Sequence, residues 1–581
     1  MSHIKHPVIS NEIVSGVRGF NLCAYLVALE GWRRGLTLKW YSDISTVSDI
    51  KKAGYNHIGK TFSLHSDNKV HYFYRSRGDG VANSAVDICK DKEETKRYLL
   101  KAGINVPTGS SFSANISDDL IFEYAERIGY PVVLKPKDGS LGKGVYSNLK
   151  NKKALQDALD NLRSEFDYSE YMVEKYIHGK EYRVYVVGSE IVGVINRIPA
   201  NIVGDGVHTI KTLIDIKNED KKKNPYLSAK PIKIDFEIKA LLKEQGYTLD
   251  SIPDSGVVVF LREKSNLSSG GDPIDATDDL PNHAQKVAID SLKAIPGLPQ
   301  AGIDLIVDHK TNKVTVLEIN ATAEIGLHVF PMHGKPRHIP SFIIDYYFPE
   351  TKGKDRLNTR VYFDFNKIYD LMMSKYVTEY EVPKAPNNEL IAKKYIVSGN
   401  VHGVGYSKWI RNQALKHKLN GFVRIKKNGD AIIVVAGTDK NIVEQFKHIC
   451  SQGPDMFYGK LIEESNWHRP VKIGFEIKEK SYEVQYRRLA EKIHVFIEDM
   501  KELREENKRL KLENEHILKQ KKNIIKKQSL LRQKHNKLSA DIKKIKKERD
   551  QFKKKYLAIL NSRTWRYTAP IRKIISSFKN K

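Results

Sequence analysis

The sequence is poor in cysteine and contains no long apolar run. Its 581 residues include only three cysteines, Cys23, Cys89 and Cys450, which lie far apart along the chain. They cannot build a disulfide framework or a zinc cluster, so we expect a reducing, cytoplasmic location. The first ten residues, MSHIKHPVIS, have no apolar core, and no run approaches about 18 apolar residues, so we expect neither a secretory signal nor a membrane span.

Acidic residues are in the minority as well. The chain has 98 Lys and Arg against 70 Asp and Glu, a formal net charge of +28. Residues 516–581 hold 22 of the basic and three of the acidic residues, a net +19, so the other 515 residues carry +9. A mildly charged body with a strongly basic tail indicates that the charge concerns where the protein is held and not what the body catalyses.

The remaining composition is that of a folded, multidomain protein. Hydrophobic residues make up 40% and aromatic residues 9%, which excludes a chain disordered throughout. One core rarely grows past roughly 250–300 residues, so three or four domains are expected. Strand and helix patterns alternate before about residue 350, which predicts an α/β or α+β fold. The domains expected are 1–86 (accessory), 87–350 (main), 351–392 (linker with a short helix), 393–480 (small α/β unit), 481–560 (coiled coil) and 561–581 (basic amphipathic tail).

Apolar residues recur every seven positions from Leu489 to Ile559 without a gap. Read as d positions, they place Asn507 and Asn514 at a positions, where asparagine favours a parallel dimer in fixed register. A sustained heptad pattern of this length predicts a coiled coil and a homodimer. The alternative, a single solvated helix, would leave the whole d series exposed.

Residues 54–61, GYNHIGKT, match the P-loop pattern letter for letter. A working P-loop needs a buried apolar strand before it and a helix after it, so that backbone N–H groups meet the phosphates. Neither SDIKKA before the motif nor FSLHSDN after it fits, and we interpret the match as accidental.

A second glycine-rich segment has a better context. Residues 130–136 predict a strand carrying Lys135, and the loop DGSLGKG follows from Asp138 to Gly144. Backbone amides of such a loop can close over phosphate oxygens, while a strand lysine supplies positive charge. Downstream, a strand ending at Glu174, a turn at Gly179 and a strand carrying Arg183 are expected. A glycine-rich turn alone is more often only a turn.

An acidic hairpin is predicted at residues 302–320. If its turn is centred on Thr311, Asp304 lies opposite Glu318, with Cβ atoms roughly 5 Å apart, and Asn320 shares their face. Two carboxylates on an otherwise apolar sheet repel unless a cation lies between them. Oxygen-only ligands favour Mg²⁺ or Mn²⁺ bound together with a nucleotide.

Together these residues resemble the ATP-grasp superfamily, and specifically the ATP-grasp module of cyanophycin synthetase and its relatives. The resemblance runs from about Asp87 to Pro349 and includes DKEETKRYLLKAGINVPTG, YPVVLKPKDGSLGKGV, VEKYIHGKEYRVYVVG, RIPANIVGDGVHTI, SNLSSGG, AGIDLIV, LEIN and HGKPR. It implies an ATP-grasp fold in which ATP converts a carboxylate into an acyl phosphate and an amine then displaces phosphate.

The resemblance also implies roles for individual residues. Arg183 and Arg197 are the expected catalytic residues, as partners of the transferred phosphoryl group or the acceptor carboxylate. The expected nucleotide and metal contacts are Lys92 and Lys135 at the phosphates, Gly139, Gly142 and Gly144 in the loop over them, Glu174 and Lys175 at the adenine, Glu181 at the ribose, and Asp304, Glu318 and Asn320 around two Mg²⁺ ions.

Two departures from the family pattern limit what the resemblance implies about the acceptor and the reaction. The family usually continues after its EVN motif with a small-residue Pro-Gly turn, whereas this chain has ATAEIG at 321–326, which leaves the acceptor undefined. The Mur-ligase-like half of cyanophycin synthetase is absent, so polymerisation of two residues in that manner is not expected.

Residues 393–480 resemble acylphosphatase, a small ferredoxin-type α/β sandwich. The segments VSGNVHGVGY (397–406) and LNGFVR (419–424) match its two signatures. The family's catalytic arginine position is Ser407 here, and its catalytic asparagine position is Ile425. We therefore expect a folded but inactive domain, with Lys408 and Arg411 as the nearby cations.

The last residues combine a short motif with an amphipathic pattern. NSRTWRYTAPIR (561–572) is similar to a motif at the ends of bacterial glycosyltransferases and surface-polysaccharide proteins. Ile571, Ile574, Ile575 and Phe578 share one helical side among Lys and Arg, a pattern typical of interfacial helices on anionic lipid. We favour a membrane surface, which would hold the cytoplasmic protein at the inner face, over nucleic acid, because the basic rod lacks interleaved aromatics.

The function expected is an ATP- and Mg²⁺-dependent ligase that joins an amino acid or amine to a carboxylated acceptor, in cell-envelope or surface-polymer synthesis. The alternatives are an acylphosphatase and a coiled-coil scaffold that binds nucleotide without turnover. The complete set of Lys92, Lys135, Asp304, Glu318 and Asn320 favours the ligase.

Overall fold

The computed structural model describes residues 9–43, 47, 50, 57–137, 144–166, 168–354, 360–478, 500, 504, 521 and 526–579. The chain divides into two compact units, 1–479 and 480–581. Within the described ranges no helix is long and apolar enough to cross a bilayer.

The N-terminal part of the first unit is built around one buried helix, α1 (Phe20–Arg33). Its sequence, FNLCAYLVALEGWR, is apolar on nearly all sides, and a helix of that kind needs partners all round. One partner is an antiparallel sheet in the order β17-β1-β2-β3-β4. The strands are β1 (Thr37–Tyr41), β2 (Thr61–His65), β3 (Val70–Tyr74), β4 (Arg77–Gly78) and β17 (Glu379–Glu381).

The motif at 54–61 is not a P-loop. Thr61 begins strand β2, so no helix follows Lys60, and helix N-terminal amides are not available to a phosphate there. Residues 51–56 lie outside the described ranges.

A four-stranded antiparallel sheet, in the order β5-β8-β6-β7, carries the predicted phosphate-binding segment. Apolar side chains of two helices pack on it, among them Phe122 and Leu159. The elements are β5 (Gly109–Ser113), α4 (Asp118–Ile128), β6 (Val132–Pro136), β7 (Tyr146–Leu149), α5 (Lys152–Glu165) and β8 (Glu170–Lys175). The strand predicted around Lys135 is thereby confirmed.

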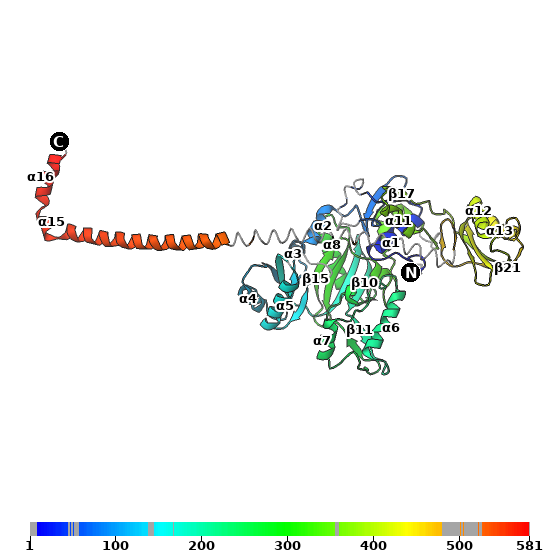
Figure 1. The fold of residues 1–581 in the computed structure, drawn as a ribbon, viewed down its shortest axis with the longest axis horizontal. Coiled ribbons are helices and arrows are strands. Elements are labelled where there is room, and N and C mark those ends of the chain that lie inside the picture. Colours follow the sequence, from blue (N-terminus) through cyan, green and yellow to red (C-terminus); the bar gives the residue numbers. More distant parts are fainter. Residues whose placement is uncertain are drawn as a thin grey trace. The chain divides into compact units, whose positions relative to one another are not determined.

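A five-stranded antiparallel sheet, in the order β13-β10-β9-β14-β15, forms the centre of the unit (Figure 1). Helices α2, α3 and α8 pack on one face, and α1, α9 and α10 lie in the cluster on the other. The elements are α2 (Asn83–Lys90), α3 (Lys92–Lys101), β9 (Lys180–Val187), β10 (Glu190–Ile198), β13 (Asp272–Asp275), α8 (Asn282–Ala294), β14 (Gln300–Asp308), β15 (Lys313–Asn320), α9 (Gly326–Val329) and α10 (Ile339–Tyr347).

A subdomain with its own small core is inserted between β10 and β13. Two strands pair antiparallel, so that Ile202 lies opposite Val259, and two helices cover one side. The elements are β11 (Asn201–Val203), α6 (Ile210–Lys223), α7 (Phe236–Glu244), β12 (Val258–Phe260) and η1 (Leu267–Ser269).

Residues 391–477 form a sheet in the order β21-β18-β20-β19-β23 with two helices packed against it. Strands cover the segments KKYIVSG, GFVRI and AIIVVAG. The elements are β18 (Ile391–Gly399), α12 (Tyr406–Lys416), β19 (Asn420–Ile425), β20 (Ala431–Gly437), α13 (Lys440–Gln452), β21 (Gly459–Asn466) and β23 (Phe475–Ile477). A multidomain α/β fold, as expected from the sequence, is confirmed.

The segment 351–392, expected to be a linker, contributes to two sheets. Strand β17 pairs with the edge strand β1, and β16 (Val361–Tyr362) pairs in parallel with β22 (Val471–Lys472). Between them lies α11 (Phe365–Met373), close to the predicted short helix, and η2 (Pro349–Thr351) precedes them. Edge strands offer unpaired N–H and C=O groups, and a partner 338 residues away along the chain cannot be read from local sequence.

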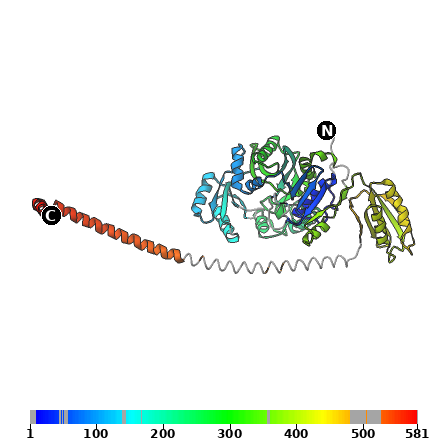
Figure 2. The ribbon, with the colours of Figure 1, turned by 90° about the horizontal axis from the view of Figure 1, so that it is seen from above.

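The second unit is helical where it is described. Residues 526–561 form one continuous helix, orange to red in Figure 2, followed by α15 (Arg563–Tyr567) and α16 (Ala569–Lys579). The coiled coil predicted over 481–560 lies largely outside the described residues, and its dimeric state stays a prediction. On α16, Ile571 and Ile575 are 56% and 55% exposed.

Candidate functional site

Lys135 and Glu174 lie together at the ends of two adjacent antiparallel strands. In β6 and β8, Val133 is paired with Glu174 and Lys135 with Met172. Lys135 Nζ is 2.6 Å from Glu174 Oε2, and Lys96 Nζ on α3 contacts Glu174 Oε1. The Glu174 side chain is 4% exposed. Burial alone would raise the pKa of Glu174, but the two ammonium groups lower it below its ordinary value.

This arrangement adds a residue that sequence reasoning missed. Lys96 lies one helical turn after Lys92, and nothing in its local sequence distinguishes it from a surface lysine. Burial lowers the pKa of Lys96, an effect that Glu174 partly offsets. The Glu174 carboxylate is thus held by two lysines, and the adenine contact predicted at Glu174 and the backbone after it stays a prediction.

The other predicted nucleotide contacts surround this pair. Lys92 Nζ donates to the Lys137 carbonyl at 2.7 Å, at the end of β6 where the glycine-rich loop begins. Lys175 Nζ donates to the carbonyls of Gly129 at 2.9 Å and Tyr130 at 3.1 Å. Gly144 has a φ of 67°, a conformation that favours glycine. Gly139 and Gly142 lie outside the described residues.

The second half of the site is on the central sheet. Strand periodicity puts Glu181 and Arg183 of β9 on one face, and Arg183 is directly opposite Asp304 of β14. Arg183 Nη2 donates to Asp304 Oδ2 at 2.7 Å, and Arg183 Nε contacts Oδ1. Arg197, on β10, places Nη2 2.7 Å from Asp304 Oδ2 and 2.6 Å from Glu181 Oε1. Ser265 Oγ donates to the other oxygen of Glu181.

These charges are almost fully withdrawn from solvent. The side chains of Arg183, Arg197 and Asp304 are 12%, 13% and 6% exposed. Burial opposes ionisation of each, yet their mutual attraction raises the pKa of both arginines and lowers the pKa of Asp304. The sequence predicted a positive charge between Asp304 and Glu318. At Asp304, two guanidinium groups supply it.

The predicted acidic hairpin is present, with Asp304 opposite Glu318. The turn is centred between Lys310 and Thr311, half a residue from the expected position, and a bulge after Asp304 restores the pairing. Asn320 Nδ2 donates to Glu318 Oε1 at 2.6 Å, so both side chains share a face as predicted.

The donor set fits a hard divalent cation. Two carboxylates on directly paired residues and one amide two positions further offer oxygen ligands only, which Mg²⁺ prefers. Mg²⁺ usually keeps waters and substrate phosphates among its ligands. Among the described residues, no group of three or more His, Cys, Asp or Glu is placed to hold a metal ion.

A buried histidine lies behind the arginines and was not anticipated. His328, on α9, is 0% exposed, and neither ring nitrogen has a hydrogen-bond partner among the described residues. Burial, together with Arg183 and Arg197, lowers the pKa of His328 to about 3. The close approach of the His328 ring to strand β10 requires glycine at position 193, because a Cβ there would lie 2.9 Å from His328 Nδ1.

Comparison with known families identifies the domains to which these residues belong. Residues 89–205 match the RimK-like ATP-grasp domain, a range that includes Lys92, Lys96 and Lys135 as well as Glu174, Glu181 and both arginines. The chain carries an ATP-grasp domain. Residues 393–477 match acylphosphatase, so the family expected for each segment is confirmed.

Similar proteins are ATP-grasp synthetases. Cyanophycin synthetase of Crocosphaera subtropica is 33% identical over 329 residues, which are 52% of this chain and 37% of that protein. The glutathione biosynthesis bifunctional protein GshAB of Enterococcus faecalis is 34% identical over 274 residues, 45% of this chain and 36% of that protein. The bifunctional glutathione synthetase of Pasteurella multocida, a crystal structure, is 32% identical with a TM-score of 0.40, covering 50% of this chain and 41% of that one. This chain thus spans well under half the length of these relatives.

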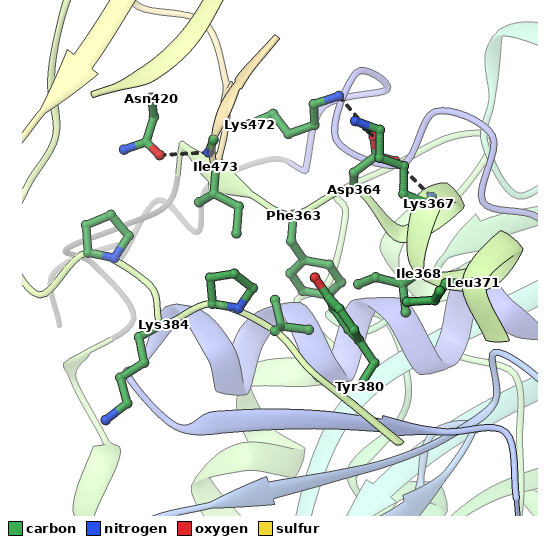
Figure 3. Close-up of a pocket in the computed structure, with 14 residues that line it drawn as sticks. Phe363, Asp364, Lys367, Ile368, Leu371, Tyr380, Lys384, Asn420, Lys472 and Ile473 are labelled. Atoms are coloured by element: carbon green, nitrogen blue, oxygen red, sulfur yellow. Dashed lines mark hydrogen bonds and ion pairs between the residues drawn. The ribbon is translucent and has the colours of Figure 1, made fainter. Parts of the chain in front are cut away.

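A separate cavity lies beside the acylphosphatase domain and contains none of the predicted site residues (Figure 3). It has a volume of about 440 Å³ and is lined by Phe363, Ile368, Leu371, Tyr380 and neighbouring prolines, with Asn420 and Lys472 from the acylphosphatase domain. Lys472 Nζ is 3.0 Å from Asp364 Oδ2, an ion pair across the cavity wall. In the acylphosphatase domain itself, Ser407 lies in the first turn of α12 and Ile425 ends β19.

Proposed function

We propose that the protein is an ATP-dependent carboxylate–amine ligase that forms an amide through an acyl phosphate. The observation that carries the proposal is the presence of two buried charge clusters in the part of the chain that resembles ATP-grasp ligases. One consists of lysines around Glu174, suited to phosphates, and the other of Arg183 and Arg197 around Asp304, beside Glu318 and Asn320. Phosphoryl transfer needs chiefly positioning and charge neutralisation, which such residues supply.

The proposed reaction has two balanced steps. First, a carboxylate oxygen of the acceptor attacks the γ-phosphorus of ATP, and the bond to the β-phosphate oxygen breaks, which gives an acyl phosphate and ADP. Second, the lone pair of the amine attacks the acyl carbon, the bond from that carbon to the phosphate oxygen breaks, and the nitrogen loses a proton. The products are an amide, inorganic phosphate and H⁺.

Each residue group has a proposed task in these steps. Lys92 and Lys135 bind the phosphates, with Gly139, Gly142 and Gly144 in the loop above them. Lys175 and the backbone after Glu174 position the adenine, and Glu181 the ribose. Asp304, Glu318 and Asn320 would hold Mg²⁺, which neutralises phosphate charge when bound. Arg183 and Arg197 bind the charge that develops on the transferred phosphoryl group or acceptor carboxylate.

We further propose a homodimer through the coiled coil, held at an anionic membrane surface and serving cell-envelope or surface-polymer synthesis. The support is the heptad pattern, the +19 of residues 516–581 and the exposure of Ile571 and Ile575 on α16.

The ligase is tested by ADP release from the purified full chain with ATP, Mg²⁺, the twenty amino acids and a panel of carboxylated acceptors. We expect release only with a matched pair, and a loss of about 100-fold or more in Glu318→Gln, since charge neutralisation is the largest catalytic term. Glu464→Gln, in the acylphosphatase domain, is the control and leaves the rate unchanged. Absence of any pair-dependent ADP, or full activity of Glu318→Gln, contradicts the proposal.

The acylphosphatase domain is proposed to be inactive, because Ser407 and Ile425 replace the residues that would bind the anion and orient water. Benzoyl phosphate hydrolysis by the Glu318→Gln protein is expected at the uncatalysed rate. Rapid hydrolysis by that variant would establish the alternative function.

A further inference from the structure

The cavity in Figure 3 lies between the segment 351–392 and the acylphosphatase domain, and it shares no lining residue with the charge clusters of the ATP-grasp domain. Its volume of about 440 Å³ falls within the range of small-molecule sites. One wall comes from residues within 363–371 and 380–386, and the other from Asn420 and residues 472–474. Both walls belong to the unit 1–479.

Backbone contacts hold the two walls together. Strand β16 pairs in parallel with β22, and the Ile473 amide donates to the Tyr362 carbonyl at 2.9 Å. Further along the segment, Trp32 Nε1 of α1 donates to the Pro383 carbonyl at 2.8 Å. The cavity is therefore formed by the fold itself, as small-molecule sites usually are.

The inner surface of the cavity is largely apolar. Phe363 is 1% exposed and Ile368 is 6% exposed, and Tyr380 is partly buried against the same core. Pro383 and Pro386, which also line the cavity, have no backbone N–H group to offer. A surface of this kind favours a flat, apolar body over a group that needs many hydrogen bonds.

Asp364 is the one acidic residue among the described residues that line the cavity, and both of its carboxylate oxygens are paired. Asp364 Oδ2 lies 3.0 Å from Lys472 Nζ and 3.8 Å from Lys367 Nζ, and Oδ1 accepts a hydrogen bond from the Lys367 amide at 3.3 Å. Lys472 also contacts Glu476, so two carboxylates compensate its charge. Among these lining residues, a cationic ligand thus meets no uncompensated carboxylate.

The other polar side chains at the rim favour an anion. Asn420 Oδ1 accepts a hydrogen bond from the Gly474 amide at 2.9 Å (Figure 3), which leaves the Asn420 NH₂ group, a donor only. Lys384 is exposed and lies on the opposite side of the cavity from Lys367 in the view of Figure 3. Three lysines line the cavity against Asp364 and, outside the lining, Glu476, and an anion would neutralise the positive charge in excess.

We propose that this cavity binds a small aromatic anion, a carboxylate or a phosphate monoester. Its ring lies against Phe363 and Ile368, and its anionic group accepts hydrogen bonds from Asn420 Nδ2 and Lys384 Nζ. A molecule in this position touches the segment 351–392 and the acylphosphatase domain at once, and it stabilises the folded chain by mass action. The proposal is independent of the ligase reaction, since it uses no residue of the ATP-grasp domain.

The test titrates the full-length protein, by saturation-transfer nuclear magnetic resonance, with three probes that share an indole ring: indole-3-acetate, indole-3-acetamide and tryptamine. We expect indole-3-acetate to bind with a Kd on the order of 0.1–1 mM, as for a ligand of this size. The neutral amide should bind about tenfold more weakly, and the tryptamine cation more weakly still. 3-Indoxyl phosphate separates the two classes of anion, and the anion with the lower Kd belongs to the class that the site prefers.

Two single substitutions locate the bound anion. Asn420→Asp keeps an oxygen for the Gly474 amide but replaces the donor with a negative charge, and it should raise the Kd of indole-3-acetate about tenfold. Lys384→Glu reverses an exposed charge at the rim and should raise this Kd about fivefold. The control is Lys427→Glu, the same charge change on an exposed lysine beyond the other end of β19 from Asn420, which should leave the Kd within about twofold.

Binding of the amide or of tryptamine as tightly as indole-3-acetate overturns the proposal, as does binding of neither anion. An equal loss in Lys427→Glu and Lys384→Glu also overturns it, because the anion would then respond only to overall charge. If Asn420→Asp does not fold, the comparison of Lys384→Glu with Lys427→Glu decides alone, since both lysines are exposed. None of these measurements depends on ADP release, so failure of this site and failure of the ligase are distinguishable.

Discussion

Two carboxylates in the ATP-grasp domain are each held between two cations, but the cations differ. Glu174 lies between Lys96 and Lys135, and Asp304 between Arg183 and Arg197. An ammonium is a point charge on a flexible stem, and a buried lysine can lose its proton, whereas a guanidinium is a planar fork that stays charged. If the proposed function holds, we expect the lysine cluster to exchange Glu174 for nucleotide phosphates and the arginine cluster to stay paired with Asp304.

The pKa shifts of Lys96 and of the two arginines differ in the same way. Burial lowers the pKa of Lys96, but the pKa of Arg183 and of Arg197 is raised by their carboxylates in spite of burial.

Asp304→Ala should have the largest effect. It leaves the buried Arg183 guanidinium without its paired carboxylate and Arg197 with Glu181 alone, and breaking a buried pair in this manner costs about 3–5 kcal/mol. We expect that loss in urea denaturation, with no ADP release. Asp278→Asn removes a 59% exposed partner of Arg337 and should change stability by less than about 1 kcal/mol. Equal losses in the two variants would show that Asp304 is not the centre of a buried frame.

Arg197→Lys should lower kcat about 10- to 100-fold with little change in stability. One guanidinium nitrogen of Arg197 contacts Glu181 and Asp304 together, and a lysine retains the charge but loses the planar fork. For the reciprocal change, Lys135→Arg, the decrease in kcat should be about tenfold smaller, because a point charge suffices to bind a phosphate. Steady-state kinetics measure both, and a larger defect in Lys135→Arg would reverse the comparison.

Glu174→Gln should destabilise the protein by about 1–3 kcal/mol, less than Asp304→Ala, because the lysines left behind can turn toward water or lose a proton. The pKa of Glu174 is lowered on folding from 4.5. Its contribution is therefore complete above pH 4.5 and is lost as the pH falls through the lower, folded value. Urea denaturation from pH 3 to 7 should show a shallower acid loss in the variant than in wild type, and identical profiles would contradict the assignment.

His328 should affect stability only below pH 6.5. Its pKa falls from 6.5 to about 3 on folding, so the unfolded chain binds more protons below pH 6.5. The contribution of His328 to stability is then complete above pH 6.5 and declines by about 1.4 kcal/mol per pH unit as the pH falls toward 3. Nuclear magnetic resonance should show a neutral ring between pH 5 and 8, with His328→Gln to assign the signal. A midpoint near 6.5 would exclude burial beside the arginines.

Several site features could be predicted because they depend on short-range rules. Strand alternation and a single turn place Asp304 opposite Glu318 with Asn320 on the same face, and the bulge after Asp304 compensates for the half-residue error in the turn. The strand carrying Lys135 and the rejection of the motif at 54–61 followed likewise from the apolar pattern beside each motif. The roles of the site residues themselves stay predictions.

The pairing of the charged side chains depends on contacts between distant segments. Lys96 and Glu174 are 78 residues apart, Arg183 and Asp304 are 121 apart, and Lys230 and Glu324 are 94 apart. Local sequence restricts the conformation and the face of each side chain but carries no information on which cation will meet which carboxylate. That choice depends on sheet order and helix packing, as it does for β17, which pairs with β1 across the chain. Local sequence patterns are enough to predict the fold class, the hairpin and the basic tail, whereas packing decides how the charges neutralise one another.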